Sequence, residues 1–286
     1  MSALPQGIVE TLARVPGIAA VVLGGSRARG RATEGSDWDL GLVFHEERPF
    51  DPGRLATALE PIVDAGSSVP TGIGAWGPWI VGGAWLKVGG TAVDLLYRPA
   101  ARLRAVIAAC RDGAVSVDYQ PGHPHGFVSA IWMGEIALCR PLHDPTGLVA
   151  ELKALADPYP EALASALVGR FGWEATFSAQ NARKAAVRGD ATHVAGCAYR
   201  TLACVAQVLF ALNRRHLINE KGALAEAAAL PLTLADLGGR EAAVWQAVGD
   251  GALAEAVAML EEMASALGDL CSRHADDVTP STESTS

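Results

Sequence analysis

The chain has 286 residues, of which 50% are hydrophobic, and a formal net charge of −8. This length and apolar content suffice for one large domain or two modest ones, and they exclude global disorder. The negative charge argues against a nucleic-acid partner, because a surface that binds nucleic acid is basic.

The chain shows no sign of export or of membrane insertion. No run of about 18 apolar residues suggests a membrane span, and the N-terminus lacks the basic and apolar segments of a signal peptide. The five cysteines are odd in number, widely spaced and without a Cys-x-x-Cys pair, which predicts buried free thiols rather than disulfides or a zinc site. We therefore expect a cytoplasmic protein.

The first half alternates short apolar runs with glycine and proline, a pattern that favours an α/β fold with neighbouring strands. Gly89-Gly90 between two such runs indicates a hairpin. The expected strands cover 19–23, 38–44, 80–88 and 91–97, and the expected helices cover 7–16, 52–64, 100–112 and 125–139.

From Pro145 the pattern becomes Ala- and Leu-rich with helical periodicity. Gly189-Asp190 places a C-terminal glycine beside an N-cap carboxylate, which predicts a tight connection between two helices. The expected helices here cover 160–188, 191–215, 221–230 and 241–271.

These patterns predict an α/β (α+β) chain: a mixed-sheet domain over 1–145, an all-helical domain over 146–275, and a disordered polar tail over 276–286.

A glycine turn with three arginines, "GGSRARGR", follows the first expected strand. It is not a P-loop, because Arg31-Ala32 stands where Lys-Ser/Thr is required, and Gly-x-Gly-x-x-Gly is absent. Gly24 and Gly25 would let the backbone approach a phosphate, Ser26 can donate its hydroxyl, and a helix starting near Ala28 would point N–H groups at the anion.

Three aspartates follow this turn. Asp37 and Asp39 are two residues apart on an expected strand, so their side chains share a face. Paired carboxylates repel unless a cation lies between them, and Mg²⁺ prefers oxygen ligands. Asp94 is a third acid in an otherwise apolar strand. If that strand lies beside the first, the three converge as in two-metal phosphoryl transfer; the alternative is a solvated Asp-x-Asp.

Taken together, "GGS", ten residues, "DWD" and a later "VDLL" resemble the signature of the DNA polymerase β nucleotidyltransferase superfamily. The resemblance is closest to the small bacterial branch that includes the aminoglycoside and lincosamide nucleotidyltransferases. "GSRARG" is similar to the usual Gly-Ser-x-Ala-x-Gly of the family.

The resemblance implies a role for each of these residues. Gly25 and Ser26 would bind the β- and γ-phosphates of ATP or another nucleoside triphosphate, and Asp37 and Asp39 would hold two Mg²⁺ ions. Asp94 would be a metal ligand, a general base, or both. Arg29 either reaches a phosphate or lies on the surface, and the sequence leaves these two open.

The region 170–221 is basic, with eight Lys/Arg against three Asp/Glu. In related two-domain nucleotidyltransferases the helical domain supplies basic residues to the triphosphate, so Lys184 and Lys221 are our candidate phosphate contacts. The alternative is two solvated helix faces. A cleft-lining role is also left open for two histidines and three tryptophans: His123, His125, Trp76, Trp79 and Trp85.

The sequence therefore predicts a Mg²⁺-dependent nucleotidyltransferase that moves AMP or another nucleoside monophosphate onto a hydroxyl of a small-molecule acceptor. The acidic chain would suit a cationic acceptor such as an aminoglycoside, and thus antibiotic resistance. The alternatives are transfer to a protein or tRNA, as in toxin–antitoxin systems, and a degenerate nucleotide-binding regulatory module. The acceptor, the preferred nucleotide and the oligomeric state are not predicted.

Overall fold

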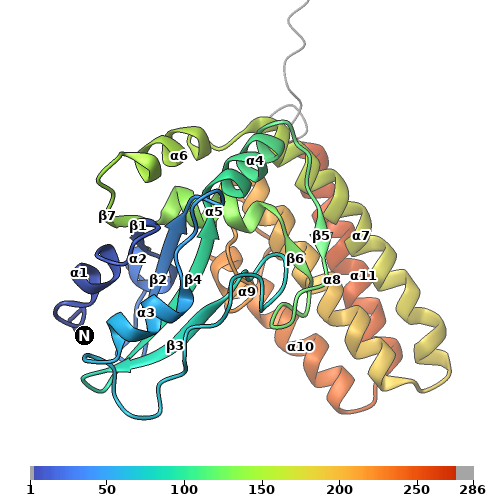
Figure 1. Cartoon of the computed structure of the whole chain (residues 1–286). Helices are drawn as coiled ribbons and strands as arrows, with labels where there is room; N and C mark the ends of the chain where they lie inside the picture. The colour runs from blue at the N-terminus through green and yellow to red at the C-terminus, as the bar shows by residue number, and fades with distance from the viewer. Residues whose placement is uncertain (1–2, 275–286) are drawn as a thin grey trace, which may run out of the picture. The chain divides into compact units, whose positions relative to one another are not determined.

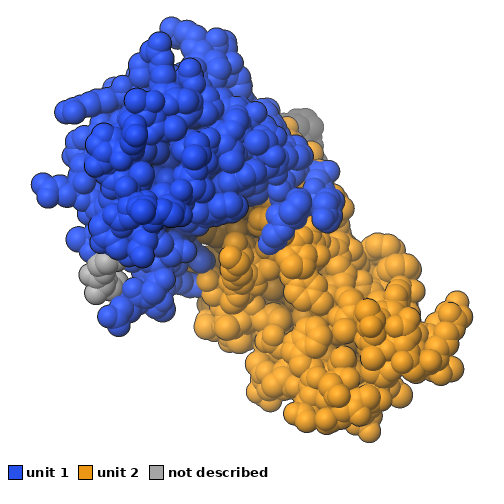
Figure 2. Space-filling view, turned by 60° about the horizontal axis from the view of Figure 1, so that its bottom comes forward, with its two compact units in different colours: residues 1–108, 118–122, 132–158 blue, residues 109–117, 123–131, 159–286 orange. Residues whose placement is uncertain are grey.

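The structure is a computed structural model that describes residues 3–274. The chain forms two compact units, which Figure 2 shows in separate colours. Unit 1 comprises residues 1–108, 118–122 and 132–158, and unit 2 comprises residues 109–117, 123–131 and 159–286. The predicted domain division at 145 stays a prediction, and the predicted tail 276–286 lies outside the described residues.

Unit 1 is built on a five-stranded mixed sheet with the strand order β3-β4-β2-β1-β7 (Figure 1). The β2–β4 pair is parallel, whereas β1–β2, β3–β4 and β1–β7 are antiparallel. This confirms the predicted mixed sheet. The strands are β1 (Ile18–Leu23), β2 (Trp38–Phe44), β3 (Gly83–Val88), β4 (Thr91–Pro99) and β7 (Arg140–His143).

The β3–β4 connection is the predicted two-residue hairpin, with Val88 paired to Thr91. Gly89 and Gly90 both have positive φ, 55° and 78°, as the twist of a tight hairpin requires. The carboxylate of Asp64 accepts hydrogen bonds from both glycine N–H groups, at 3.2 and 2.7 Å. The turn is therefore fixed by glycine geometry and by one acidic side chain.

The helices of the first half are shorter than the sequence predicts. α3 begins after the N-cap Asp51 with Pro52 in its first turn, but it ends at Leu59 rather than near 64. The expected ranges did not include the edge strand β7, which contains Pro141, or the helix α6, although the helical periodicity from Pro145 covers it. The helices are α1 (Ile8–Ala13), α2 (Gly25–Ala28), α3 (Pro52–Leu59), α4 (Ala100–Arg111), α5 (Ala130–Leu138) and α6 (Leu148–Ala156).

Unit 2 is mainly helical, with α7 (Glu161–Val187) packed along α8 (Ala191–Leu212). Their connection is the predicted one: Gly189 has φ 71°, and the Asp190 carboxylate accepts a hydrogen bond from the His193 N–H at 3.0 Å. The chain continues through α9 (Ala223–Ala228), α10 (Leu237–Gly249) and α11 (Leu253–Arg273), and it also contains the short strands β5 (Val117–Asp118) and β6 (Phe127–Val128).

A single helix over 241–271 was predicted, and this is wrong. The chain breaks there between α10 and α11, where Gly251 adopts a positive φ of 75° that a helix cannot continue through.

Among the described residues, α8 alone is long and apolar enough to cross a membrane, but 72% of its most apolar stretch is buried inside the protein. It is the central helix of unit 2 (Figure 1), and its apolar surface is covered by neighbouring helices. The cytoplasmic location stays a prediction.

Candidate functional site

Two of the three predicted carboxylates lie side by side on the sheet. Asp39 of β2 and Asp94 of β4 are direct partners in the parallel register of these strands. Residues that are directly paired on neighbouring strands point to the same side of a sheet. The two side chains are both half-buried, so the fold brings two acids from distant parts of the sequence to one face.

The third carboxylate is placed differently. β2 begins at Trp38, so Asp37 precedes the strand and is exposed. Asp37 therefore lies one residue outside the strand, and the expectation that it shares a face with Asp39 stays a prediction. Within residues 3–274 no three His, Cys, Asp or Glu side chains are grouped so that they could hold a metal ion. The described structure thus assembles a pair of acids, and the roles of all three stay predictions.

Gly25 touches the carboxylate of Asp39. It has φ 60°, and a Cβ at this position would lie 1.7 Å from the Asp39 Oδ2 atom. In addition, the Gly24 N–H donates to the Asp39 carbonyl oxygen at 2.8 Å. The sequence suggested that glycine is needed here so that a phosphate can approach. In the structure, the neighbour that requires glycine is the aspartate itself.

The turn continues into α2, which runs only from Gly25 to Ala28. The predicted helix starting near Ala28 is wrong, because the helix ends there. The first N–H groups of a helix have no partner inside it, so the N–H groups at Gly25 and Ser26 suit an anion. Ser26 and Arg29 are half-buried, and their contact with phosphate stays a prediction.

Arg27 is a site residue that the sequence analysis did not assign. Only 7% of it is exposed, and its guanidinium donates to the Asp37 carbonyl at 3.0 Å and to the Ser36 carbonyl at 2.6 Å. It also lies over the ring of Trp38, 4.3 Å from the centroid. Arg27 therefore fixes the backbone that carries Asp37. The only signal in the sequence was the tryptophan between the two aspartates.

An aromatic pair borders Asp94. Trp85 of β3 is the direct antiparallel partner of Asp94 and therefore lies on the same face. It stacks on Trp76 with ring centroids 4.6 Å apart, yet 59% of it remains exposed. Trp79 instead packs on Trp132. Trp85 is thus placed to stack on a ligand held near Asp94.

The basic candidates of the helical region are in unit 2, where Lys184 of α7 and Lys221, just before α9, are both exposed. Their contact with a triphosphate stays a prediction. Three arginines of the basic region 170–221 are paired with acids of unit 2, and these pairs reduce the excess positive charge of the region. The pairs are Arg183 with Glu261, Arg200 with Glu174 and Arg214 with Glu161.

The two histidines are both held in unit 2. His123 Nδ1 and Glu220 Oε2 are 3.0 Å apart. His125 is 3% exposed, and the Arg200 guanidinium donates to its Nδ1 at 3.0 Å. Burial first, and then the charge of Arg200, lower the pKa of His125 to about 3. His125 is therefore a neutral imidazole whose Nδ1 accepts, so its Nε2 carries the proton.

Comparison with known proteins agrees with the N-terminal geometry. Residues 6–69 match the family described as "Nucleotidyltransferase domain", and residues 135–221 match "Domain of unknown function (DUF4037)". The first match includes the glycine turn, Asp37 and Asp39, whereas Asp94 lies beyond it. The chain thus carries a nucleotidyltransferase domain of the DNA polymerase β-like type.

One solved structure similar to this chain is described as a nucleotidyltransferase-like protein from Exiguobacterium sibiricum 255-15. It is 10% identical, with a TM-score of 0.40, over 95% of this chain and 78% of that chain. No curated protein matches. These matches do not distinguish the aminoglycoside branch, which the sequence suggested, from other branches of the superfamily.

The neutral state of His125 predicts a pH dependence of stability. Between about pH 6.5 and 3 the unfolded chain binds a proton at this histidine and the folded chain does not, so acid favours unfolding. Below pH 6.5 we expect the free energy of unfolding of the wild type to fall by about 1.4 kcal/mol more per pH unit than that of His125→Gln. Urea unfolding between pH 4 and 8 measures this, with the exposed His193→Gln as control. Parallel profiles for wild type and His125→Gln would contradict the prediction.

Proposed function

We propose that the N-terminal domain transfers a nucleoside monophosphate, with ATP as the first candidate donor, to a hydroxyl of a small-molecule acceptor and releases pyrophosphate. One observation supports this most: Asp39 and Asp94 are paired in register on one sheet face. The glycine turn lies against Asp39, so the backbone that we propose for phosphate binding adjoins two acids.

The donor set at this face fits a hard divalent cation. Two carboxylates on adjacent strands repel each other, and a cation between them removes that cost. Their oxygens are the ligand type that Mg²⁺ prefers, and Gly25 has no side chain that would cover Asp39 Oδ2. Asp39 and Asp94 would hold the metal, with Asp37 as the further ligand. When bound, Mg²⁺ would neutralise the charge that develops on the phosphate oxygens.

The residues of the turn would hold the triphosphate tail. The N–H groups at Gly25 and Ser26 and the Ser26 hydroxyl are hydrogen-bond donors at the start of α2. Arg29, which is half-buried at the end of the same short helix, would add charge if it reaches the phosphates. This arrangement would fix the β- and γ-phosphates and leave the α-phosphorus near the carboxylates.

In the transfer step, the acceptor oxygen forms a bond to the α-phosphorus while the bond to the bridging oxygen of pyrophosphate breaks. The hydroxyl proton leaves to a carboxylate, for which Asp94 is our candidate because it adjoins the exposed Trp85. Trp85 would stack on the acceptor or on the nucleotide base and so orient it. A cationic acceptor such as an aminoglycoside would suit the acidic chain.

Nucleotidyl transfer can be tested by an acceptor screen with ATP and Mg²⁺ that detects the mass gain of one nucleotidyl unit. We expect Asp39→Asn and Asp94→Asn to lower kcat by roughly 10²- to 10⁴-fold, because each removes a charge needed at the reacting phosphate. Asp269→Asn, an exposed acid on α11, is the matched control and should leave kcat unchanged. Undiminished transfer in Asp39→Asn would contradict the proposal.

The contact between Gly25 and Asp39 gives a second prediction. Gly25→Ala should abolish transfer, because its Cβ would displace the Asp39 carboxylate and its positive φ is strained for alanine. Gly35→Ala adds the same methyl group where nothing lies within 4 Å, and it should retain activity. Steady-state kinetics and thermal unfolding of both variants decide this. Equal activity in the two alanine variants would show that the contact is not needed.

A further inference from the structure

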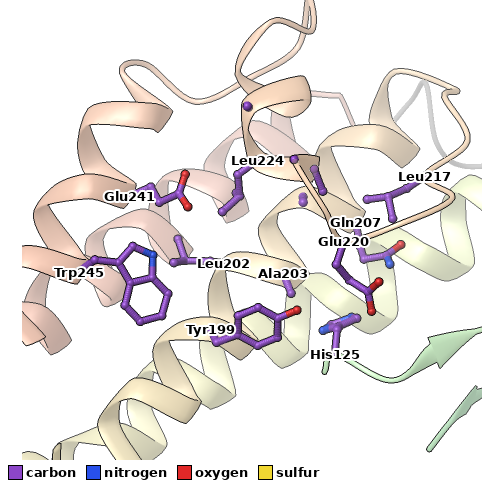
Figure 3. Close-up of a pocket in the computed structure, with 14 residues that line it drawn as sticks. His125, Tyr199, Leu202, Ala203, Gln207, Leu217, Glu220, Leu224, Glu241 and Trp245 are labelled. Carbon is purple, nitrogen blue, oxygen red and sulfur yellow. The ribbon is translucent and has the colours of Figure 1, made fainter. Parts of the chain in front are cut away.

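Unit 2 contains a cavity of about 210 Å³. Its lining side chains come from the loop that carries His125, from α8, from the loop before α9, from α9 itself and from α10 (Figure 3). None of these residues belongs to the nucleotidyltransferase site described above. The lining combines two carboxylates, two aromatic rings and several leucines, a composition that is selective for one class of ligand.

The cavity is negatively charged. Glu220 and Glu241 both line it. Burial raises the pKa of the Glu220 carboxyl, but the hydrogen bond and charge of His123 outweigh this and lower it below the ordinary value. Glu220 is therefore an anion whose Oε2 is paired with His123. An anionic ligand is disfavoured here, because it would face two carboxylates.

Two buried polar atoms in the lining have no protein partner. Oε1 of Glu220 and Nε2 of His125 are both buried, and no side chain or backbone group among the described residues hydrogen-bonds to either. His125 Nε2 is a donor, since Nδ1 accepts from Arg200. A buried acceptor and a buried donor without partners each cost free energy. A ligand that supplies the missing partners would recover that cost.

The rest of the wall is apolar and aromatic. Tyr199 and Trp245 project toward the cavity from α8 and α10 (Figure 3). Leu202, Leu217 and Leu224 complete the apolar surface. Aromatic faces attract organic cations, and leucines favour the hydrocarbon part of a ligand. The volume is below the roughly 300–1,000 Å³ of sites for drug-sized ligands, so a single ring with a short arm is the appropriate size.

We propose that this cavity binds a small organic ammonium compound, with its cationic group on Glu220, with Glu241 adding negative charge across the cavity, and with its hydrocarbon part between Tyr199, Trp245 and the leucines. The Nε2–H of His125 would donate to an oxygen of the ligand where it has one. This site does not depend on nucleotidyl transfer, and a binding measurement without nucleotide tests it separately. The match to the domain of unknown function includes Tyr199 and Glu220, and the site would give that region a binding role.

The test is isothermal titration calorimetry of the full chain, without nucleotide, with three compounds of similar size and shape. 2-Phenylethylamine is the cation, 2-phenylethanol the neutral analogue and 3-phenylpropionate the anion. We expect the amine to bind, the alcohol to bind roughly 10- to 100-fold more weakly, and the anion not to bind, since a charge-assisted contact contributes this much. No binding of the amine, or equal affinity for amine and alcohol, would overturn the proposal.

Variants locate the site. Glu220→Gln and Glu241→Gln should each weaken binding of the amine by about tenfold or more. Glu255→Gln replaces an exposed acid on α11 and should bind like wild type. Because Glu220 also holds His123, Ala203→Phe provides an independent variant that fills the cavity with a ring and should abolish binding. Wild-type affinity in Ala203→Phe, with its fold confirmed by circular dichroism, would place the bound amine elsewhere and refute the site.

Discussion

The parallel pairing of β2 with β4 is the constraint on which the N-terminal site depends. It sets Asp39 opposite Asp94, although 54 residues separate them in the sequence. The antiparallel pairing of β1 with β2 then brings the glycine turn to the same end of β2, where Gly25 meets the Asp39 carboxylate. A slip of one residue between β2 and β4 would turn one acid to the other face of the sheet and separate the pair.

Each unit contains an arginine that organises the groups around it. In unit 2 the Arg200 guanidinium is shared between Glu174 and His125, so a charged network is satisfied by protein groups. In unit 1, the Arg27 guanidinium donates to the backbone carbonyl oxygens of Ser36 and Asp37 and so holds the chain just before β2.

Local patterns predicted β1 to β4, the glycine hairpin and the Gly189-Asp190 connection, because alternation, paired glycines and caps act over a few residues. They could not reveal the contact of Arg27 with the Asp37 carbonyl, since the two residues meet only in the folded turn. They also missed the break between α10 and α11, where one glycine outweighs a long helical pattern. The cavity of unit 2 was beyond prediction, because His125 and Trp245 meet only through tertiary folding.

We propose that Asp39 and Asp94 together form one metal–nucleotide site. A crystal structure with Mn²⁺ and a non-hydrolysable ATP analogue tests it most directly, since manganese takes the oxygen ligands of magnesium and scatters anomalously. We expect an anomalous peak coordinated by carboxylate oxygens of both Asp39 and Asp94, with the triphosphate at the Gly25-Ser26 turn. The proposal would be contradicted if the manganese ion bound at most one of these two carboxylates and the nucleotide bound away from the Gly25-Ser26 turn.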